Sequence, residues 1–470
     1  MHAEVRDIVI LGGGPCGLGA AHRAQEKGLD WLLLEKEDRL GGLASSFRDT
    51  AGFTWDIGAH VLFSHYETFD RFMDAALGSD GWLHHVRESW IRVRGRFVPY
   101  PFQHNLHRLD PEARWECVEG LLRVWLLRNG NRPLQQPSDF HEWMTATFGE
   151  GITKYFMFPY NCKVWMVNPR EMDYGWIGER VPLPDLFRVL RSVCTGQDAV
   201  SWGPNYRFRF PRAGGTGAIW QSLGEKLDQG RVRAGEAVVR VDPERRELET
   251  ASGRLIRYQV LLSTMPLDRL AQLTGRPEWI GVAGRLRRSA VLMVGFGLRG
   301  AVPEELATKC WMYFPDEQVP CYRVTVFSNY SPANVPAPGR FWSLMTEVAF
   351  RPGTRPRVRQ GAQKIISALE GEALIPDRSA IISVADRYAE YAYPIPFRGR
   401  DGVVDPLLRE LEEQGIFSRG RFGAWKYEVG NMDHSFAQGY ECVERIAAGG
   451  GPEMEPTLHR PDWVNSRRND

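Results

Sequence analysis

The stretch Asp7-Ile-Val-Ile-Leu-Gly-Gly-Gly-Pro-Cys-Gly17 decides the fold of this chain. Its apolar run ends in glycines, which is typical of a strand buried on both faces. A small-residue segment, Leu18 to Lys27, predicts a helix, and a second apolar run, Trp31 to Leu34, ends at Glu35. Strand, glycine turn, helix, strand and acid in this order are the context of a dinucleotide-binding fold.

A physical requirement explains the glycine at three positions of the turn. Gly12 permits the tight turn, Gly14 lets a pyrophosphate approach the backbone, and Gly17 lets helix and strand pack closely. Glu35 can accept a ribose hydroxyl. The glycine pattern alone is weak evidence, because glycine clusters often only make turns. The flanking strands, the helix and the acid together predict a dinucleotide site.

FAD is favoured over NAD by the residues that follow. Arg39 to Ala44 adds a second glycine pair, as in large flavoproteins of the glutathione-reductase and amine-oxidase type. The alternative is an ordinary surface turn. Three later segments, Val232–Val241, Glu247–Thr250 and Val260–Thr264, have the composition of strands. In such flavoproteins this region rejoins the dinucleotide fold, so we expect a discontinuous domain.

The rest of the chain has two other patterns. Helical spacing indicates helices over Pro111–Arg128, Asp139–Phe148 and Glu179–Ser192. Alternating apolar and polar residues indicate strands over Ala290–Arg299, Cys310–Phe314, Tyr322–Ser328 and Phe341–Phe350. The predicted fold class is α/β, with a discontinuous Rossmann-like FAD-binding domain, a helical domain and an antiparallel sheet domain.

Composition excludes several function classes. With 470 residues the chain can form more than one core, and its net charge of +1 implies neither nucleic acid nor an anionic membrane as partner. Met1 to Arg6 lacks the features of a secretory signal and no apolar run could cross a bilayer, so a cytoplasmic location is expected. The seven cysteines form no CxxC pair, which argues against a zinc site or a disulfide framework.

Two segments near the first fold carry candidate site residues. His60 follows a glycine-containing turn, and the alternative for a lone histidine is a surface or hydrogen-bonded residue. Gly95 to Gln103 is an aromatic cluster with one amide. Aromatic faces stack on a flat base, and a glutamine can both donate to and accept from its edge. Core packing would explain Phe102 equally well, but it explains Gln103 less well.

Tyrosines and arginines recur in the second half of the chain. Each is more often structural when taken alone, but guanidinium forks and phenol hydroxyls together suit a diphosphate. They are Tyr313, Arg323, Tyr330, Tyr393, Arg421 and Tyr427. Gly430 to Phe436 precedes an expected last helix, Ala437 to Ala447, whose N-terminus could stabilise negative charge on the flavin. Asp433 or Ser435 could equally cap that helix.

Longer motifs, in order along nearly the whole chain, carry a resemblance to a known family. The motifs are His60-Val-Leu-Phe-Ser-His-Tyr66, Phe97-Val-Pro-Tyr-Pro-Phe-Gln103, Pro159-Tyr-Asn-Cys-Lys-Val-Trp165, Trp176-Ile-Gly-Glu-Arg180, Trp202-Gly-Pro-Asn205, Phe210-Pro-Arg-Ala-Gly-Gly-Thr-Gly217, Phe327-Ser-Asn-Tyr-Ser-Pro332 and Ser418-Arg-Gly-Arg-Phe-Gly-Ala-Trp-Lys-Tyr-Glu-Val-Gly-Asn431. The chain resembles UDP-galactopyranose mutase, and specifically the eukaryotic-type branch of that family.

The resemblance implies an architecture and a reaction. Residues 1–84, 208–275 and 410–470 would form the FAD domain, 104–207 the helical domain with mobile flaps at 177–185 and 201–207, and 85–103 with 276–409 the sheet domain. The reaction would be a redox-neutral pyranose–furanose isomerisation of a UDP-sugar, with N5 of reduced FAD attacking the anomeric carbon. NADPH would be the reductant, although the chain shows no separate motif for it. Oligomeric state is not readable from the sequence.

The resemblance also implies roles for individual residues. Arg180 and Arg323 would flank the diphosphate with Tyr313, Tyr330, Tyr393 and Tyr427, while Asn205 would reach the sugar or diphosphate and His60 would lie near the flavin. The uracil, ribose and phosphate would meet Tyr100, Phe102, Gln103, Phe156, Asn161 and Trp165. The flavin would be lined by Gly12, Gly14, Pro15, Cys16, Gly17, Glu35, Lys36, Gly42, Leu43, Gly58, Ala59, His60, Arg87, Arg421, Gly430, Asn431, Met432 and Ser435.

Two residues depart from the family pattern. Ala59 stands where this branch has a second glycine before the histidine, and Met432 replaces a polar residue beside the flavin. Both departures concern redox behaviour more than the type of reaction. The alternative function is an FAD-dependent oxidoreductase of the amine-oxidase-like superfamily, which has the same cofactor fold but has no need of the diphosphate tyrosines and arginines.

Overall fold

The N-terminal unit forms as the glycine turn predicts. In a computed structural model, which describes residues 3–130, 135–201, 206–354 and 356–466, strand β1 (Glu4–Leu11) leads through the turn into helix α1 (Pro15–Glu26) and strand β2 (Trp31–Leu34). β1 and β2 pair in parallel, and their apolar residues are buried on both faces. Leu18–Lys27 was expected to be the helix, which begins three residues earlier because Pro15 suits a first helical position.

A seven-stranded sheet is built around this unit from distant parts of the chain. Its order is β10-β11-β12-β1-β2-β9, with β18 paired to the end of β12. The pairs β1–β2, β1–β12, β2–β9 and β12–β18 are parallel, whereas β10–β11–β12 is an antiparallel meander. The added strands are β9 (Val232–Arg233), β10 (Val238–Asp242), β11 (Glu247–Thr250), β12 (Leu255–Ser263) and β18 (Ile416–Ser418).

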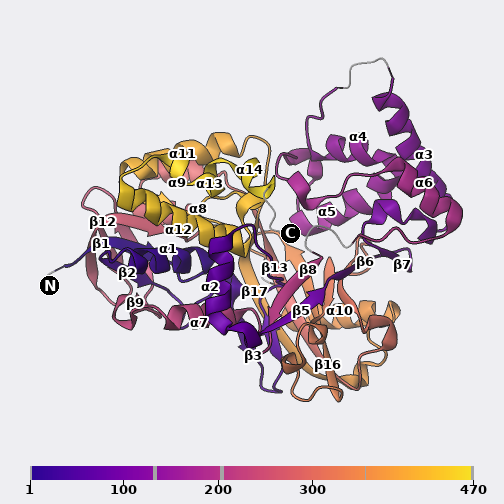
Figure 1. The fold of residues 1–470 in the computed structure, drawn as a ribbon, viewed down its shortest axis with the longest axis horizontal. Coiled ribbons are helices and arrows are strands. Elements are labelled where there is room, and N and C mark those ends of the chain that lie inside the picture. Colours follow the sequence, from indigo (N-terminus) through magenta and orange to yellow (C-terminus); the bar gives the residue numbers. More distant parts are fainter. Residues whose placement is uncertain (1–2, 131–134, 202–205, 355, 467–470) are drawn as a thin grey trace.

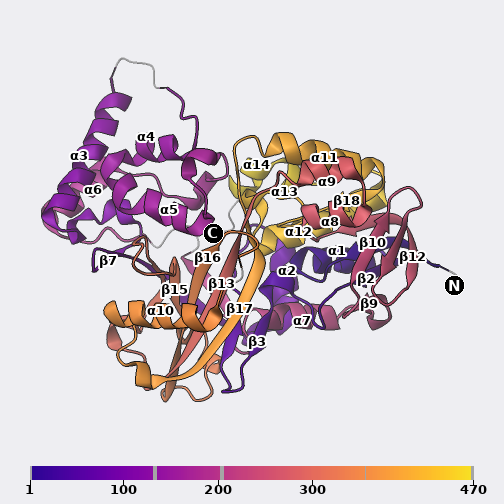
Figure 2. The ribbon, with the colours of Figure 1, turned by 180° about the vertical axis from the view of Figure 1, so that it is seen from behind.

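Val232–Val241 is not one strand, as the sequence indicated. It is split into β9 and β10 because Gly235 has a left-handed backbone (φ 74°) between them. Helices cover the sheet on both sides and lie together in Figures 1 and 2. They are α7 (Gly217–Glu225), α8 (Leu267–Thr274), α9 (Pro277–Ala283), α11 (Asp401–Glu413), α12 (Met432–Ala448), α13 (Pro456–His459) and α14 (Pro461–Ser466).

Helix α12 crosses α1 at a very short distance. A side-chain Cβ at Gly439 would lie 1.9 Å from the carbonyl oxygen of Cys16, and one at Gly19 would lie 2.3 Å from that of Phe436. Glycine is therefore required on both helices at this crossing. α12 begins at Met432, five residues before the expected start, and this extension brings its N-terminus to the end of the sheet that carries the glycine turn.

A second seven-stranded sheet has the order β17-β13-β16-β15-β14-β6-β7. It is antiparallel, as expected, except that β14 and β6 pair in parallel. Helix α10 (Val358–Gly371) packs its apolar face against this sheet. The strands are β6 (Glu88–Val93), β7 (Arg96–Pro99), β13 (Arg288–Arg299), β14 (Lys309–Tyr313), β15 (Arg323–Val326), β16 (Phe341–Phe350) and β17 (Ile381–Pro394).

Short elements join the two sheets. The hairpin of β3 (Ser46–Arg48) and β4 (Thr54–Asp56) places Phe53 and Trp55 over Gly297 and Gly295 of β13. A Cβ at either glycine would lie within 2.6 Å of an aromatic ring. Helix α2 (Glu67–Leu77) and the pair β5 (Trp82–Val86) and β8 (Arg207–Pro211) complete the connection.

The helical segment follows β7 and returns through β8. It contains α3 (Pro111–Arg128), α4 (Phe140–Ile152), α5 (Phe158–Trp165) and α6 (Leu186–Thr195), and it lies to one side in Figure 1. The expected helix Glu179–Ser192 is wrong in its first part. Pro182 and Pro184 break it, so a short turn, η7 (Gly178–Arg180), is followed by α6, which Asp185 caps.

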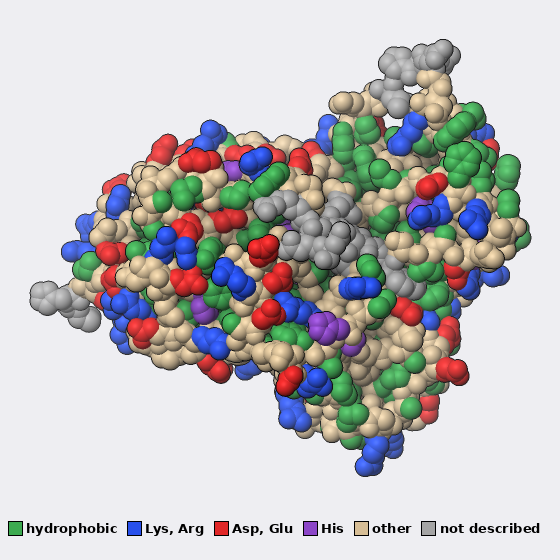
Figure 3. Space-filling model, in the orientation of Figure 1, with side chains coloured by type: hydrophobic (Ala, Val, Ile, Leu, Met, Phe, Trp, Pro, Cys, Tyr) green, Lys and Arg blue, Asp and Glu red, His purple; other side chains and the backbone are tan. Residues whose placement is uncertain are grey.

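Surface character differs between the parts of the molecule. In Figure 3 charges of both signs are interspersed, and hydrophobic side chains gather over the helical segment at the upper right. Trp115 and Leu126 of α3 and Phe187 of α6 are 62%, 63% and 77% exposed. Among the described residues, no helix combines the length and the apolar character needed to cross a membrane.

Candidate active site

A cavity of about 1110 Å³ lies where the two sheets and the helical segment meet. Its walls come from the glycine turn, strands β14 to β17, helix α5, the 177–185 loop and the N-terminus of α12. Segments that are far apart in the sequence therefore share one space.

The glycine-turn end of this cavity fits a dinucleotide. Gly14 and Gly42 both line it with their backbones close together, since a Cβ on Gly42 would lie 3.3 Å from Cα of Gly14. No side chain caps α1, and its first turn has no acid, so the helix N-terminus is suited to a pyrophosphate. The buried Glu35 carboxylate accepts hydrogen bonds from the amides of Gly13 (2.6 Å) and Glu37 (2.9 Å).

Most residues expected at the flavin line the cavity. They are Gly12, Gly14, Pro15, Cys16, Glu35, Lys36, Gly42, Leu43, Gly58, Ala59, His60, Arg87, Arg421, Gly430, Asn431, Met432 and Ser435. Gly17 does not line it. A Cβ there would lie 1.8 Å from the carbonyl oxygen of Gly12, so Gly17 has the packing role that the sequence pattern gave it.

Most of the expected substrate residues line the same cavity. They are Tyr100, Gln103, Phe156, Asn161, Trp165, Arg180, Tyr313, Arg323, Tyr393 and Tyr427. Phe102 is fully buried behind Phe156, with ring centroids 5.1 Å apart. Tyr330 is also buried, among Phe208, Phe210 and Phe327, and is not a wall of the cavity. Asn205 lies outside the described residues.

Arg323 is held by a carboxylate that the sequence analysis did not single out. Its Nε and Nη2 donate to Glu347 Oε2 (2.5 Å) and Oε1 (2.8 Å), and the Tyr322 hydroxyl donates to the same carboxylate. Burial alone would lower the pKa of Arg323, but the Glu347 charge raises it well above its usual value. A charged residue inside the apolar strand Phe341–Phe350 was the available signal for Glu347.

Arg180 and Arg421 both lie close to the Tyr427 ring. Their guanidinium carbons are 5.6 Å and 5.4 Å from its centroid. Arg421 donates to the carbonyls of Ala392 and Gly430, and Arg180 donates to that of Glu428. Throughout the described ranges, neither guanidinium pairs with a carboxylate. Burial lowers the pKa of Arg421, so an anion between these two cations would relieve an unfavourable charge arrangement.

The tyrosines at this end of the cavity are neutral donors. Burial raises the pKa of Tyr313 and of Tyr393, so both hydroxyls keep their protons at neutral pH. Because the Tyr322 proton goes to Glu347, Tyr393 donates to the Tyr322 hydroxyl (3.2 Å) in this structure, and a bound anion would compete for that proton. The arrangement can therefore donate hydrogen bonds to a polyanion without adding further charge.

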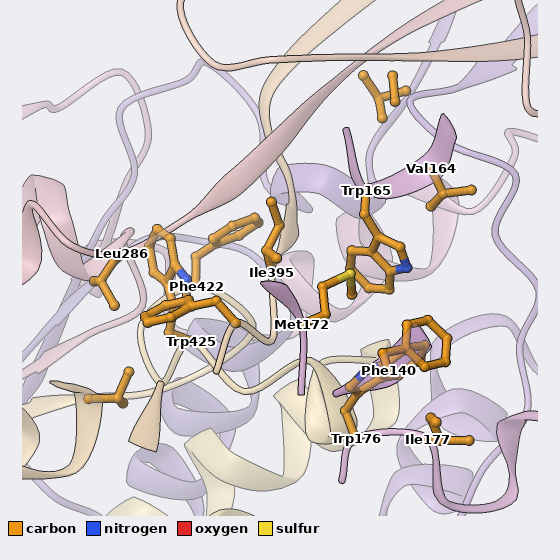
Figure 4. Close-up of a cluster of buried hydrophobic side chains, with 14 of the residues drawn as sticks. Phe140, Val164, Trp165, Met172, Trp176, Ile177, Leu286, Ile395, Phe422 and Trp425 are labelled. Carbon is orange, nitrogen blue, oxygen red and sulfur yellow. The ribbon is translucent and has the colours of Figure 1, made fainter. Parts of the chain in front are cut away.

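Another part of the cavity wall is aromatic. Tyr100, Phe156 and Gln103 line it, and Gln103 Nε2 donates to the carbonyl of Pro182 in the 177–185 loop. Asn161 accepts from Trp165 Nε1 (3.0 Å) and donates to the carbonyl of Met157 (2.7 Å). Figure 4 shows Trp165 and Trp176 in the apolar cluster that also contains Phe422 and Trp425.

His60 faces this space as a neutral base. Its Nδ1 is buried and meets no partner within the described part of the chain, which leaves it available to a bound group. Burial lowers the pKa of His60 to about 4, although the nearby Glu347 opposes this shift. The neighbouring Ala59 is buried with Val61 and Phe208 in one apolar cluster.

Two other residues of the cavity wall, Trp311 and Tyr160, were not predicted from the sequence. The Trp311 ring contacts both Arg87 and Arg323, whose guanidinium carbons are 4.6 Å and 4.8 Å from its centroid. The Tyr160 ring contacts the rings of Phe156 and Tyr313. Both occur in segments rich in aromatic residues, where spacing alone does not distinguish a core ring from a cavity wall.

Comparisons with known proteins agree with this geometry. Residues 10–76 match the NAD(P)-binding Rossmann-like domain family. A crystal structure of reduced UDP-galactopyranose mutase is 42% identical, with a TM-score of 0.92, and the match covers 98% of each chain. The chain belongs to the UDP-galactopyranose mutase family.

More distant curated relatives match parts of this chain. A probable UDP-galactopyranose mutase of Klebsiella pneumoniae is 23% identical over 180 residues, which are 38% of this chain and 45% of that protein. The flavin-containing amine oxidase A of Canis lupus familiaris is 23% identical over 66% of this chain and 56% of its own length. The chain thus spans about half the length of these curated relatives. The UDP-galactopyranose mutase family makes it an isomerase, and the flavoprotein relatives support FAD as its dinucleotide.

Proposed function

We propose that the protein isomerises a UDP-sugar between its pyranose and furanose forms, with UDP-galactopyranose and UDP-galactofuranose as the pair, and that it requires reduced FAD. One observation carries the proposal. Three arginines and three tyrosines, namely Arg180, Arg323, Arg421, Tyr313, Tyr393 and Tyr427, meet in the cavity that the glycine turn also lines. A diphosphate would satisfy these donors beside a flavin, whereas an amine oxidase has no such ligand.

The chain would hold FAD by the contacts that its geometry supports. The pyrophosphate would lie at the uncapped N-terminus of α1, and the isoalloxazine would lie near His60 and the N-terminus of α12. When bound and reduced, FAD would supply the nucleophilic nitrogen, N5, for the anomeric carbon.

The protein's own residues would bind and orient the substrate. Tyr100 and Phe156 would stack on uracil, with Gln103 hydrogen-bonded to its edge and Asn161 and Trp165 near the ribose. Gln103 now donates to the Pro182 carbonyl, so this hydrogen bond would have to break before Gln103 could bind the uracil edge. Tyr330, which is not a wall of the cavity in this structure, keeps its proposed role only for a closed state, and Asn205, which lies outside the described residues, keeps the role that the resemblance implies.

Charge stabilisation would be the main catalytic contribution of the chain. Breaking the anomeric bond leaves negative charge on UDP, and Arg180 and Arg323 would stabilise it together with the neutral tyrosines. Glu347 orients Arg323 through two hydrogen bonds and leaves Nη1 for the phosphate. His60 stays neutral at pH 7 and can exchange a hydrogen bond, but not a full charge, with the flavin edge.

Anaerobic incubation tests the proposal. Enzyme reduced with dithionite is mixed with UDP-galactofuranose, and the products are separated by chromatography; oxidised enzyme is the control. We expect UDP-galactopyranose only from the reduced enzyme. Absence of conversion together with substrate-dependent reduction of the oxidised flavin would replace the mutase function with that of an oxidoreductase.

The proposal also includes the reductant and membership of the eukaryotic-type branch of the family. NADPH is the proposed electron donor, and the eukaryotic-type motifs noted above are its support. Aerobic oxidation of NADPH by the FAD-loaded protein would measure it directly, with NADH as the comparison.

A further inference from the structure

The C-terminal segment and the loop that carries Arg180 meet at one carbonyl group. Arg180 Nη2 donates to the carbonyl oxygen of Glu428 (2.5 Å), and Asn465 Nδ2 donates to the same oxygen (3.2 Å). Asn465 lies in α14, 37 residues beyond Glu428 in the chain, and its side chain is buried. A guanidinium from the helical segment and an amide from the C-terminal helix therefore share one acceptor.

The turn that provides this acceptor is also part of the candidate site. η13 (Tyr427–Val429) carries Tyr427, whose ring contacts the guanidinium groups of both Arg180 and Arg421. The side chain of Glu428 is buried and forms two hydrogen bonds with Arg400 (2.6 and 2.7 Å). The Glu428 peptide is therefore fixed by a buried ion pair on one side and by Asn465 on the other.

Helix α14 contacts both the turn that carries Arg180, η7, and the turn that carries the Glu428 carbonyl, η13. Figures 1 and 2 show α14 on the side of the flavin-binding half that faces the helical segment. The preceding residues anchor it, because Glu455 pairs with Arg419 and Arg445, and Thr457 bonds to Glu441 of α12.

We propose that Asn465 is a positioning residue for the Arg180 loop, and that α14 sets the position of this loop before substrate binds. The proposal rests on the proposed function for the role of Arg180 at the diphosphate, but not for the position of the loop. Without the Asn465 amide, the Glu428 carbonyl loses one of its two hydrogen bonds, and it holds the Arg180 loop less firmly. The loop then leaves its position more often, and the diphosphate meets a less ordered Arg180.

Limited trypsin digestion measures how often the Arg180 loop leaves its position, and it does not depend on the enzyme being active. Trypsin cleaves after Arg180, and mass spectrometry identifies this cut. In the FAD-loaded protein without substrate, Asn465→Asp and Asn465→Ala should be cut there about fivefold faster than wild type, the factor expected for one lost hydrogen bond. Asp462→Asn, an exposed position on the same helix, is the matched control and should be cut at the wild-type rate.

Binding of UDP provides the second measurement. The Kd of UDP should rise about fivefold in both Asn465 variants, whereas FAD content and the melting temperature stay near wild type. Asn465→Asp keeps the size of the side chain, so it serves if the alanine variant does not accumulate. Wild-type cleavage rates and wild-type UDP affinity in Asn465→Asp would overturn the inference.

The two proposals can fail separately. If wild type forms no UDP-galactopyranose but Asn465→Asp exposes the Arg180 bond, the function is wrong and the positioning role stands. If wild type is a mutase and the Asn465 variants leave cleavage after Arg180 unchanged, the positioning role is wrong and the function stands.

Discussion

Arg323 is the residue whose loss should separate binding of FAD from turnover. It lines the cavity from β15 of the second sheet, and its partner Glu347 lies on β16 of the same sheet rather than in the dinucleotide-binding sheet. Arg323→Ala should lower turnover by about two to three orders of magnitude, a typical effect of removing a charge-stabilising donor. FAD content, measured by absorbance after denaturation, should be unchanged.

A matched change supports the interpretation of that result. Arg340→Ala removes an exposed arginine and should leave turnover and FAD content as in wild type. Loss of FAD in Arg323→Ala would mean that this arginine contacts the flavin instead of the diphosphate.

His60 predicts a pH dependence of stability. Its pKa is about 4 in the folded chain and about 6.5 when unfolded, so the unfolded chain binds more protons between these values. The stabilising contribution of neutral His60 is complete above pH 6.5 and is lost as the pH falls toward 4. His60→Gln should therefore lose less stability than wild type over this window, by up to about 3 kcal/mol. Urea unfolding at pH 7 and pH 4.5 measures the difference, and parallel losses in both proteins would contradict it.

At the scale of elements, the α1–α12 crossing should tolerate no added methyl group. Gly439→Ala would bring a Cβ to 1.9 Å from the Cys16 carbonyl, so one helix must shift. We expect a loss of about 1–3 kcal/mol in unfolding free energy and weaker FAD binding, because both helix N-termini line the cavity. A Cβ at Gly402 in α11 has no neighbour within 4 Å in the described part of the chain, so Gly402→Ala is the control. Equal melting temperatures for the two variants would show that the crossing is looser than described.

The sequence predicted elements well where apolar residues repeat clearly. β11, β16 and α3 have the predicted bounds, because their patterns are bordered by turns, by polar residues or by a helix-starting proline. β17 was missed. Its residues Ile381–Pro394 are mostly polar or half-buried at the sheet edge, so they lack the period-two pattern on which the prediction depends.

The candidate site was less completely predictable from the sequence than the helices and strands were. Motifs identified most of the cavity walls, but not the contacts between them. Pairing of Arg323 with Glu347, and of Arg180 with the Glu428 carbonyl, depends on how distant segments fold together. Tyr330 illustrates the converse, since a residue in a recognisable motif lies beneath the cavity among aromatic rings.

At the scale of the whole molecule, a lysine holds the helical segment to the second sheet. Lys163 of α5 donates to the carbonyls of Phe314, Asp316 and Val319, which follow β14. Lys163→Met would leave these carbonyls without that donor and should cost about 1–3 kcal/mol. Because Asn161 and Trp165 lie on the same helix, the KM for the UDP-sugar should rise as well.

An exposed lysine provides the comparison for that variant. Lys364→Met on α10 should leave both the melting temperature and the KM unchanged. A Lys163→Met protein with lower stability but wild-type KM would show that α5 does not position the ribose end of the cavity.

The discontinuous sheet also sets an order of assembly during synthesis. The glycine turn leaves the ribosome first, but β12, β18 and the first turn of α12 complete its surroundings, and α12 begins only at Met432. A nascent chain that has already formed β1, α1 and β2 therefore lacks one wall of the cavity until translation is almost finished. We therefore expect FAD to bind late in synthesis, and we expect chains that end before α12 to retain it poorly.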